Sequence, residues 1–277
     1  MMDSKDRALT SRARQRGLSL IELMIGIALS LLILTAVLYS FAGSQASYRY
    51  LTSFSAVQES GRIALELLNR DIRMAGNSGC GNVIYLDHRS PDIFSNNIVL
   101  ETAPGADAGA SDGITIRYGS GATTTVTLSP ADNIFGVADI AALGTVDVGD
   151  RLLLSDCLTT EVLTIAAMGA NSITTKDNLS HGFKPGTVVM RLETVTYTVA
   201  GSELRRNGQA VAAGVTDMQL LYGIAGAADR AALGYIEKPT KAADDLAVAV
   251  RVALTVADGA DVSQRFFSSV ALRNRLP

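Results

Sequence analysis

The sequence predicts an α+β protein in which a long N-terminal helix packs on a mainly antiparallel β-sheet head. Three observations support this prediction. An apolar run covers residues 18–42, apolar residues then recur every three or four positions over 44–75, and short runs rich in Val, Ile and Thr follow. No helical pattern of crossover length separates these later runs, so an antiparallel sheet is favoured over a parallel one.

The composition sets the broad class of the protein. The chain has 277 residues, is 48% hydrophobic and 18% charged, and carries a formal net charge of −3. These values exclude a disordered chain. The chain also lacks the excess of positive charge that is typical of nucleic-acid-binding proteins. Two Cys and two His are too few for a disulfide-rich mini-protein or for most histidine-built metal sites. We therefore predict no metal, no cofactor and no nucleic-acid partner. A calcium site on the loop carboxylates remains the alternative, although these residues lack the EF-hand spacing; they are Asp107, Asp112, Asp132, Asp139, Asp147 and Asp150.

The N-terminal segment combines a basic leader with a stretch long enough to cross a bilayer. Residues 1–17 hold five cations and two anions, which gives this segment a charge of +3. Residues 18–42 then contain a single charged side chain, Glu22, and about 20 apolar residues span the hydrocarbon core as a helix. Because flanking cations stay cytoplasmic, the residues after the span are expected to face the periplasm.

Two ordinary interpretations compete for this segment. A cleavable secretory signal has an apolar region of about 7–15 residues, and the present run is longer. A plain signal anchor fits the length, but it leaves Glu22 unexplained because a carboxyl group inside an apolar span is costly. Hydropathy alone leaves the plain anchor open.

The junction between leader and span resembles a type IV prepilin processing site. Residues 15–23 read QRGLSLIEL, so a basic leader ends at Gly17, apolar Leu18 follows, and Glu22 is the fifth residue after Gly17. The resemblance implies cleavage between Gly17 and Leu18 by a membrane prepilin peptidase, which then methylates the new amine of Leu18. Since this cut precedes the apolar run, the span stays on the mature protein.

Glu22 is expected to act in assembly. An ionised carboxylate in apolar surroundings needs a partner, and an α-amine remains cationic at neutral pH. Four residues at about 1.5 Å place Glu22 roughly 6 Å along the helix axis from the Leu18 amine. The resemblance implies that this carboxylate neutralises the amine of a neighbouring subunit. The alternative is a carboxylate that is tolerated near the membrane surface.

Three further segments resemble the PilW type of minor pilin. Residues 61–80, GRIALELLNRDIRMAGNSGC, are similar to the end of the long helix and the first turn of that family, and residues 214–224 and 269–277 also resemble it. The middle of the chain, about residues 85–185, resembles no family that we can place and is interpreted as a divergent insertion. The resemblance implies a subunit of the minor-pilin complex that initiates or caps a type IV pilus.

This family implies a set of partners and a location. The partners are the prepilin peptidase, other minor pilins, the major pilin, the inner-membrane assembly platform and, before assembly, membrane lipid. The subunit would sit in the inner membrane with its N-terminus cytoplasmic and its head periplasmic, and would then enter the pilus on the cell surface. The implied role is structural, and we predict no enzymatic activity.

We divide the chain into four segments. They are a cleaved leader over 1–17, a transmembrane or fibre-core helix over 18–43, its amphipathic continuation over 44–76, and a β-rich head over 77–277. The helix is expected to run nearly unbroken from 18 to 75, with Gly43 and Gly61 as candidate interruptions. Its core-facing stripe is predicted to comprise Leu51, Phe54, Gln58, Gly61, Leu65, Leu68, Ile72 and Ala75, with Val57, Ala64 and Met74 beside it. Ion pairs are expected at the helical spacings of Glu59 with Arg62 and of Glu66 with Arg70.

The head is expected to consist of short strands joined by turns. The candidate strands cover 97–100, 113–118, 123–128, 151–155, 161–166, 172–175, 188–199, 203–206, 215–222, 246–256 and 266–272. Residues 225–233 are interpreted as a short helix or loop. His88 and His181 fall in turn-like segments and are interpreted as solvated, as are the adjacent Arg205 and Arg206.

Cys80 and Cys157 are predicted to form a disulfide. The outward topology places both thiols in an oxidising compartment, where thiols tend to pair. The bond would close a loop of about 78 residues and on the chain-entropy model contribute about 4.5 kcal/mol. Two buried free thiols remain the alternative.

Two functional alternatives share some of these features. A pseudopilin of a type II secretion system would carry the same N-terminal chemistry. A membrane-anchored periplasmic binding protein or enzyme with a prepilin-like leader is of a different class, and a concave pocket with convergent titratable groups would favour it. The sequence contains no nucleophile elbow, phosphate-binding loop or metalloprotease motif.

Overall fold

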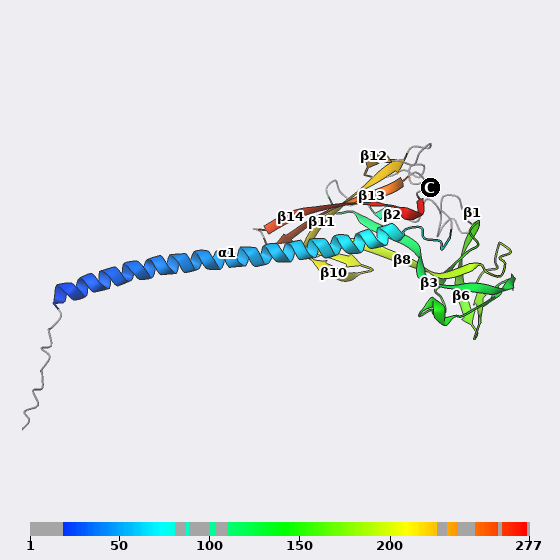
Figure 1. The fold of residues 1–277 in the computed structure, drawn as a ribbon. Helices are drawn as coiled ribbons and strands as arrows, with labels where there is room; N and C mark the ends of the chain where they lie inside the picture. Colours follow the sequence, from blue (N-terminus) through cyan, green and yellow to red (C-terminus); the bar gives the residue numbers. More distant parts are fainter. Residues whose placement is uncertain are drawn as a thin grey trace, which may run out of the picture. The chain divides into compact units, whose positions relative to one another are not determined.

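The computed structural model has the predicted α+β architecture (Figure 1). It describes residues 19–80, 87–88, 100–103, 110–225, 232–237, 247–259 and 262–275. A single long α-helix, α1 (Leu20–Met74), precedes strands that form two sheets. The chain divides into two compact units, Met1–Thr52 and Ser53–Pro277, so α1 contributes to both of them.

Helix α1 is continuous through both glycines that were candidate interruptions. Gly43 has open space around it, whereas Gly61 meets β14 (Val262–Ala271). A Cβ atom at Gly61 would lie 2.4 Å from Cε2 of Phe266. The missing side chain therefore lets an aromatic ring of the sheet pack directly on the helix backbone.

The buried face of α1 differs in part from the predicted stripe. The buried residues are Val57, Gly61, Ala64, Leu68, Asp71 and Ile72. Leu51 and Gln58 are exposed instead, and Leu65 is half-buried. Gly61, Leu68, Ile72 and Ala75 are buried as predicted, and Val57 and Ala64, which stand beside the predicted stripe, are buried with them.

The smaller sheet has four antiparallel strands in the order β12-β11-β13-β14. Its other members are β11 (Val215–Ala225), β12 (Ala232–Ile236) and β13 (Ala247–Asp258). β13 is central and buries Val250, Val252 and Leu254 against the helix. β12 begins within the segment that was interpreted as a helix or loop, so that interpretation was wrong for its last residues.

The larger sheet has ten strands. They are β1 (Asp87–His88), β2 (Leu100–Ala103), β3 (Gly113–Ala131), β4 (Ile134–Val137), β5 (Arg151–Ser155), β6 (Thr159–Met168), β7 (Ser172–Thr175), β8 (Val188–Ala200), β9 (Glu203–Arg206) and β10 (Gln209–Ala213). Apart from β1, which runs parallel to β6, every pairing is antiparallel. The strand order is β10-β9-β8-β5-β6-β7-β4-β3-β2, and β8 also pairs with β3.

That additional pairing closes a six-stranded antiparallel barrel in the middle of the chain. The ring runs β3-β4-β7-β6-β5-β8 and returns to β3. A separate core fills it, made of Val126, Phe135, Val137, Leu143, Val146, Leu152, Leu154, Leu163, Ile165, Ile173, Phe183 and Val189. The barrel thus occupies most of the segment that resembles no known family.

β3 and β8 belong to both parts of the larger sheet. The first portion of β3 pairs with β2 and buries Ile116 in the core that contains α1. The last portion of β8 pairs with β9 and buries Val195 in the same core, and these two portions also pair with each other. A register shift between Gly119 and Thr123 then bends β3 into the barrel. The runs 113–118 and 123–128, predicted as two strands, are therefore one strand with an irregularity.

Candidate functional site

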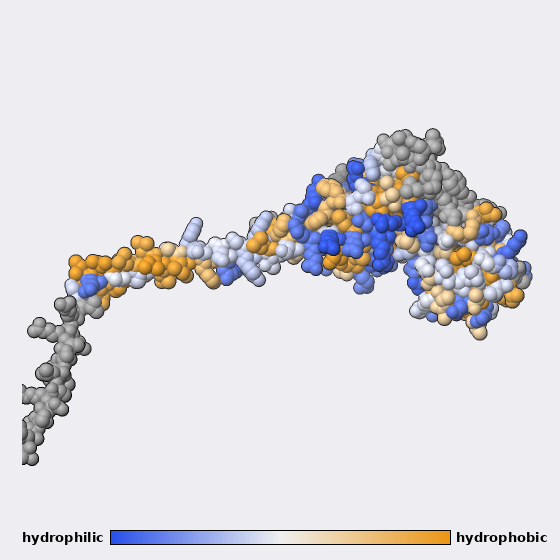
Figure 2. Space-filling model, in the orientation of Figure 1, coloured by the Kyte–Doolittle hydropathy of each residue, from blue (hydrophilic) through white to orange (hydrophobic). Residues whose placement is uncertain are grey.

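The first part of α1 exposes apolar side chains on all sides. Every residue from 19 to 52 is exposed in the isolated chain. Figure 2 shows apolar colouring along the first stretch of this segment and paler, more hydrophilic colouring along its later stretch. Among the described residues, α1 is long and apolar enough to cross a membrane. A helix that is apolar all round needs lipid or other protein around it, so this surface is the strongest functional feature of the chain.

Two hydroxyl groups within the apolar run bond to the helix backbone itself. Ser30 Oγ donates a hydrogen bond to the carbonyl oxygen of Ile27 at 2.9 Å, and Thr35 Oγ1 donates to that of Leu31 at 2.7 Å. Such bonds to the preceding turn remove the need for water or an outside partner. Ser30 and Thr35 therefore fit an apolar environment.

Glu22 is the exception on this surface. It lies exposed in the first turn of α1, where the partial positive charge of a helix N-terminus favours a carboxylate. Its spacing from Ser19 is that of a capping box, yet no hydrogen bond or ion pair to Glu22 is present among the described residues. Its carboxylate is therefore available to a partner. Gly17 and Leu18, the predicted processing residues, lie outside the described residues.

The comparison with known protein families decides what kind of segment this is. Residues 12–38 match the prokaryotic N-terminal methylation motif. The chain carries a type IV pilin-like prepilin leader. The match includes the leader end, the predicted cleavage junction and Glu22, and it implies processing by prepilin peptidase and assembly into a pilus or pseudopilus. No curated protein and no solved structure matches the chain.

In this pilin-like protein, the second part of α1 is joined to the sheets through a buried carboxylate. Asp71 is 3% exposed. Its Oδ2 accepts hydrogen bonds from Tyr197 Oη and Arg206 Nε, both at 2.8 Å, and its Oδ1 accepts one from Tyr118 Oη at 3.5 Å. The three donors come from β8, β9 and β3, so a single helical residue contacts three strands.

This cluster shifts the titration of its members. Burial raises the pKa of Tyr197, and the hydrogen bond to Asp71 raises it further. Burial followed by the Asp71 charge also raises the pKa of Tyr118. For Arg206, burial alone would lower the pKa, but the hydrogen bond and charge of Asp71 outweigh it and hold the guanidinium protonated.

The environment of Arg206 corrects the interpretation of the Arg205 and Arg206 pair as solvated edge charges. Adjacent residues of a strand point to opposite faces. Arg205 pairs with Glu203 at 2.9 Å and is 41% exposed, whereas Arg206 turns toward Asp71 under the helix. Arg205 therefore lies at the surface, as predicted, whereas Arg206 does not.

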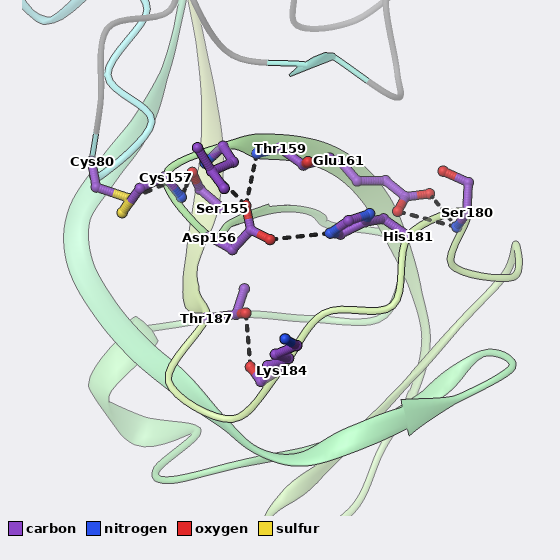
Figure 3. Close-up of polar contacts among 11 residues, drawn as sticks. Cys80, Ser155, Asp156, Cys157, Thr159, Glu161, Ser180, His181, Lys184 and Thr187 are labelled. Carbon is purple, nitrogen blue, oxygen red and sulfur yellow. Dashed lines mark hydrogen bonds and ion pairs between the residues drawn. A yellow bond between two sulfur atoms is a disulfide. The ribbon is translucent and has the colours of Figure 1, made fainter.

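A disulfide joins Cys80 to Cys157, the predicted pair, with their Cα atoms 5.0 Å apart (Figure 3). Cys80 follows the end of α1, and Cys157 lies in the turn between β5 and β6 with a positive φ of 70°. The bond therefore connects the segment after the helix to the barrel. On the chain-entropy model a loop of this length contributes about 4.5 kcal/mol.

The turn that holds Cys157 is organised by Asp156 (Figure 3). Its Oδ1 accepts the N–H groups of Leu158 and Thr159 at 3.0 and 2.7 Å, and its Oδ2 lies 3.1 Å from His181 Nε2. Partial burial would raise the pKa of Asp156, but the bonds from Thr159, Leu158 and His181 together lower it.

His181 lies in a loop as predicted, but its side chain is not free in solvent. Its side chain is 30% exposed, contacts Asp156 and packs edge-on against Phe183, with ring centroids 4.8 Å apart. His88 lies in β1, and its side chain lies outside the described residues. Among the side chains that the structure describes, no three His, Cys, Asp or Glu residues gather as a metal site would require.

Proposed function

We propose that this protein is a non-enzymatic minor pilin of a type IV pilus. Prepilin peptidase cleaves it between Gly17 and Leu18 and methylates Leu18, and the mature chain enters the fibre through the first part of α1. The observation that supports the proposal is the methylation motif at residues 12–38, which leads directly into a helix that is apolar on every face.

The proposed mechanism is an exchange of apolar surroundings. Before assembly, lipid covers the exposed side chains of the helix, with the basic leader cytoplasmic and the head periplasmic. In the fibre, the helices of neighbouring subunits cover the same side chains. Because lipid and protein are both apolar, the transfer avoids exposing this surface to water, whose cost is about 25 cal/mol per Å².

In this mechanism Glu22 determines how far neighbouring subunits are displaced along the fibre axis. Within an apolar bundle an unpaired carboxylate is unfavourable, and the methylated amine of Leu18 on a neighbouring subunit is a cation at the matching end of the helix. Pairing the two groups neutralises both of them. A subunit displaced along the fibre axis by the wrong distance would leave two unpaired charges in the core, so the pair selects one axial stagger.

The PilW-like segments support a place in the minor-pilin complex. Residues 61–80 form the end of α1, 214–224 form most of β11, and 269–277 include the end of β14. Asn274 Nδ2 donates hydrogen bonds to the carbonyl oxygens of Met74 and Ala75 at 3.4 and 3.1 Å, which caps the helix C-terminus. The three segments thus contribute to one shared core, as segments retained for one architecture would.

The test compares two variants in the source bacterium after deletion of the gene. Glu22→Ala is expected to reach the membrane in normal amount but to be missing from sheared pili. Ser30→Ala, which removes a self-satisfied hydroxyl from the same helix, is expected to be incorporated normally. Normal incorporation of Glu22→Ala would contradict the proposed pairing. Intact pili together with a loss of secreted enzymes in the deletion strain would assign the protein to type II secretion instead.

A further inference from the structure

A groove of about 750 Å³ lies between the second part of α1 and strand β14. The two elements run beside each other (Figure 1), in contact through Gly61 and Phe266. Apolar groups of Leu65, Met74 and Phe266 line the groove. Both walls belong to the compact unit Ser53–Pro277, so this surface is separate from the membrane-spanning part of the helix.

The strand wall of the groove is β14, which lies at the edge of its sheet among the strands that the structure describes. β14 pairs with β13 over ten consecutive residues without a register shift and ends the order of its sheet. It contains no proline, and Phe267 is 62% exposed on it. Sheet edges in monomeric proteins are usually blunted by bulges, prolines or inward charges. Within the described residues, β14 has a regular backbone whose outer N–H and C=O groups pair with no strand, so they can accept another strand.

The helix wall carries an excess of positive charge. Arg62, Arg70 and Arg73 line it together with one acid, Glu66. Neither of the predicted helical ion pairs, Glu59 with Arg62 or Glu66 with Arg70, is formed in the described part of the chain. The closest carboxylate to Arg70 is that of Asp71, with Nε and Oδ1 3.9 Å apart, and that carboxylate is already bound by Arg206.

We propose that an extended acidic segment of another protein chain adds to the free edge of β14. Main-chain hydrogen bonds to the edge would hold the segment, and its alternate side chains would face the helix. Arg62 and Arg73 are eleven residues apart, roughly 16 Å along the axis at about 1.5 Å per residue. Three acidic residues at every second position of a strand cover about 13 Å, so they match the row of arginines. This inference does not depend on the leader or on fibre entry.

The test uses the full chain in detergent micelles and two fluorescein-labelled nine-residue peptides. One peptide alternates Glu with Val, and the other alternates Lys with Val. Fluorescence anisotropy is expected to show binding of the Glu peptide at least tenfold tighter than that of the Lys peptide. Arg62→Glu/Arg73→Glu is expected to reverse this preference. The control Arg151→Glu/Lys176→Glu makes the same change of charge on exposed barrel residues and is expected to leave it unchanged.

Amide hydrogen exchange locates the bound peptide. The Glu peptide is expected to slow exchange in residues 262–271, because half of the N–H groups of an edge strand have no partner until a strand is added. Equal binding of both peptides, the same effect in the control variant, or protection outside β14 would overturn the proposal. Protection that rises with protein concentration alone would show that a second copy covers the edge. If the groove variant fails to fold, the two peptides and the exchange pattern of the unmodified chain still decide.

Discussion

Nε of Arg206 on β9 lies 2.8 Å from Oδ2 of Asp71 on α1, although the two residues are 135 positions apart in the chain. Helix packing removes the carboxylate from water, while the arginine remains 32% exposed. An ionised group in such a place is stable only with charge and hydrogen-bond partners. The contact therefore ties the orientation of the helix to a particular strand of the larger sheet.

Removing this arginine should destabilise the head. In Arg206→Met the buried carboxylate loses its hydrogen-bonded cation and, among the described residues, keeps only the cation Arg70, whose Nε lies 3.9 Å from Oδ1. Unpairing a buried charge costs about 3–5 kcal/mol. Because Arg206 is partly exposed, we expect about 2–4 kcal/mol, measured by urea unfolding of the full chain in detergent. Arg205→Met on the same strand removes a surface pair worth about 0–1 kcal/mol and serves as the control. Equal losses in the two variants would show that the Asp71 contact does not matter.

The buried tyrosines should make the head sensitive to alkali. The raised pKa values of Tyr118 and Tyr197 mean that the unfolded chain ionises first as pH rises. Stability is therefore complete below about pH 10, the ordinary tyrosine value, and declines above it. Thermal unfolding between about pH 8 and 11 should show this decline, and Tyr118→Phe should reduce its slope. A Tyr118→Phe profile that matches the unmodified chain would contradict the assignment.

The disulfide should contribute measurably to stability. Replacing both cysteines by serine, as Cys80→Ser/Cys157→Ser, is expected to lower the free energy of unfolding by up to about 4.5 kcal/mol. A reducing agent should lower the melting temperature of the unmodified chain toward that of the variant. The variant itself supplies the control, because its melting temperature should not respond to the same agent.

Processing should depend on Gly17. Gly17→Val is expected to block cleavage, so that the full-length chain accumulates in the membrane, whereas Ser19→Ala should be cut normally. Mass spectrometry of the N-terminal peptide checks both results. For the unmodified chain it should find Leu18 as the first residue, carrying one methyl group. An N-terminus after residue 42 would instead indicate a cleaved secretory signal.

The elements that depend on local pattern were predictable from the sequence. The long helix follows from hydropathy and three-to-four spacing, and β5, β7 and β9 have the predicted bounds. β4 was missed because its four residues include Gly136 and make no distinctive pattern. It is a strand because it pairs on both sides, with β3 and β7, which is a relation that local sequence does not contain.

The candidate site shows the same division. The leader, junction and Glu22 form one short segment, so their chemistry is visible in sequence. Asp71 and Arg206 each look like an ordinary surface charge, since both stand in polar stretches with other charged residues nearby. Their meeting under the helix depends on the packing of α1 against β9. An acidic residue on the apolar side of an amphipathic helix was the one available signal, because Asp71 lies three residues after Leu68 and four before Ala75 of the predicted stripe.

The shared strands β3 and β8 have a mechanical consequence. Both strands pass from the helix-packed sheet into the barrel as single elements, and they are hydrogen-bonded to each other in both places. A pulling force on the barrel would therefore act on the hydrogen bonds between β3 and β8 in both parts of the sheet. It would not simply stretch a flexible linker. The Cys80–Cys157 bond adds a covalent route for the same force to the chain just after α1. These connections would transmit tension from the barrel to the helix-packed sheet. They would also limit rotation of the barrel relative to that sheet.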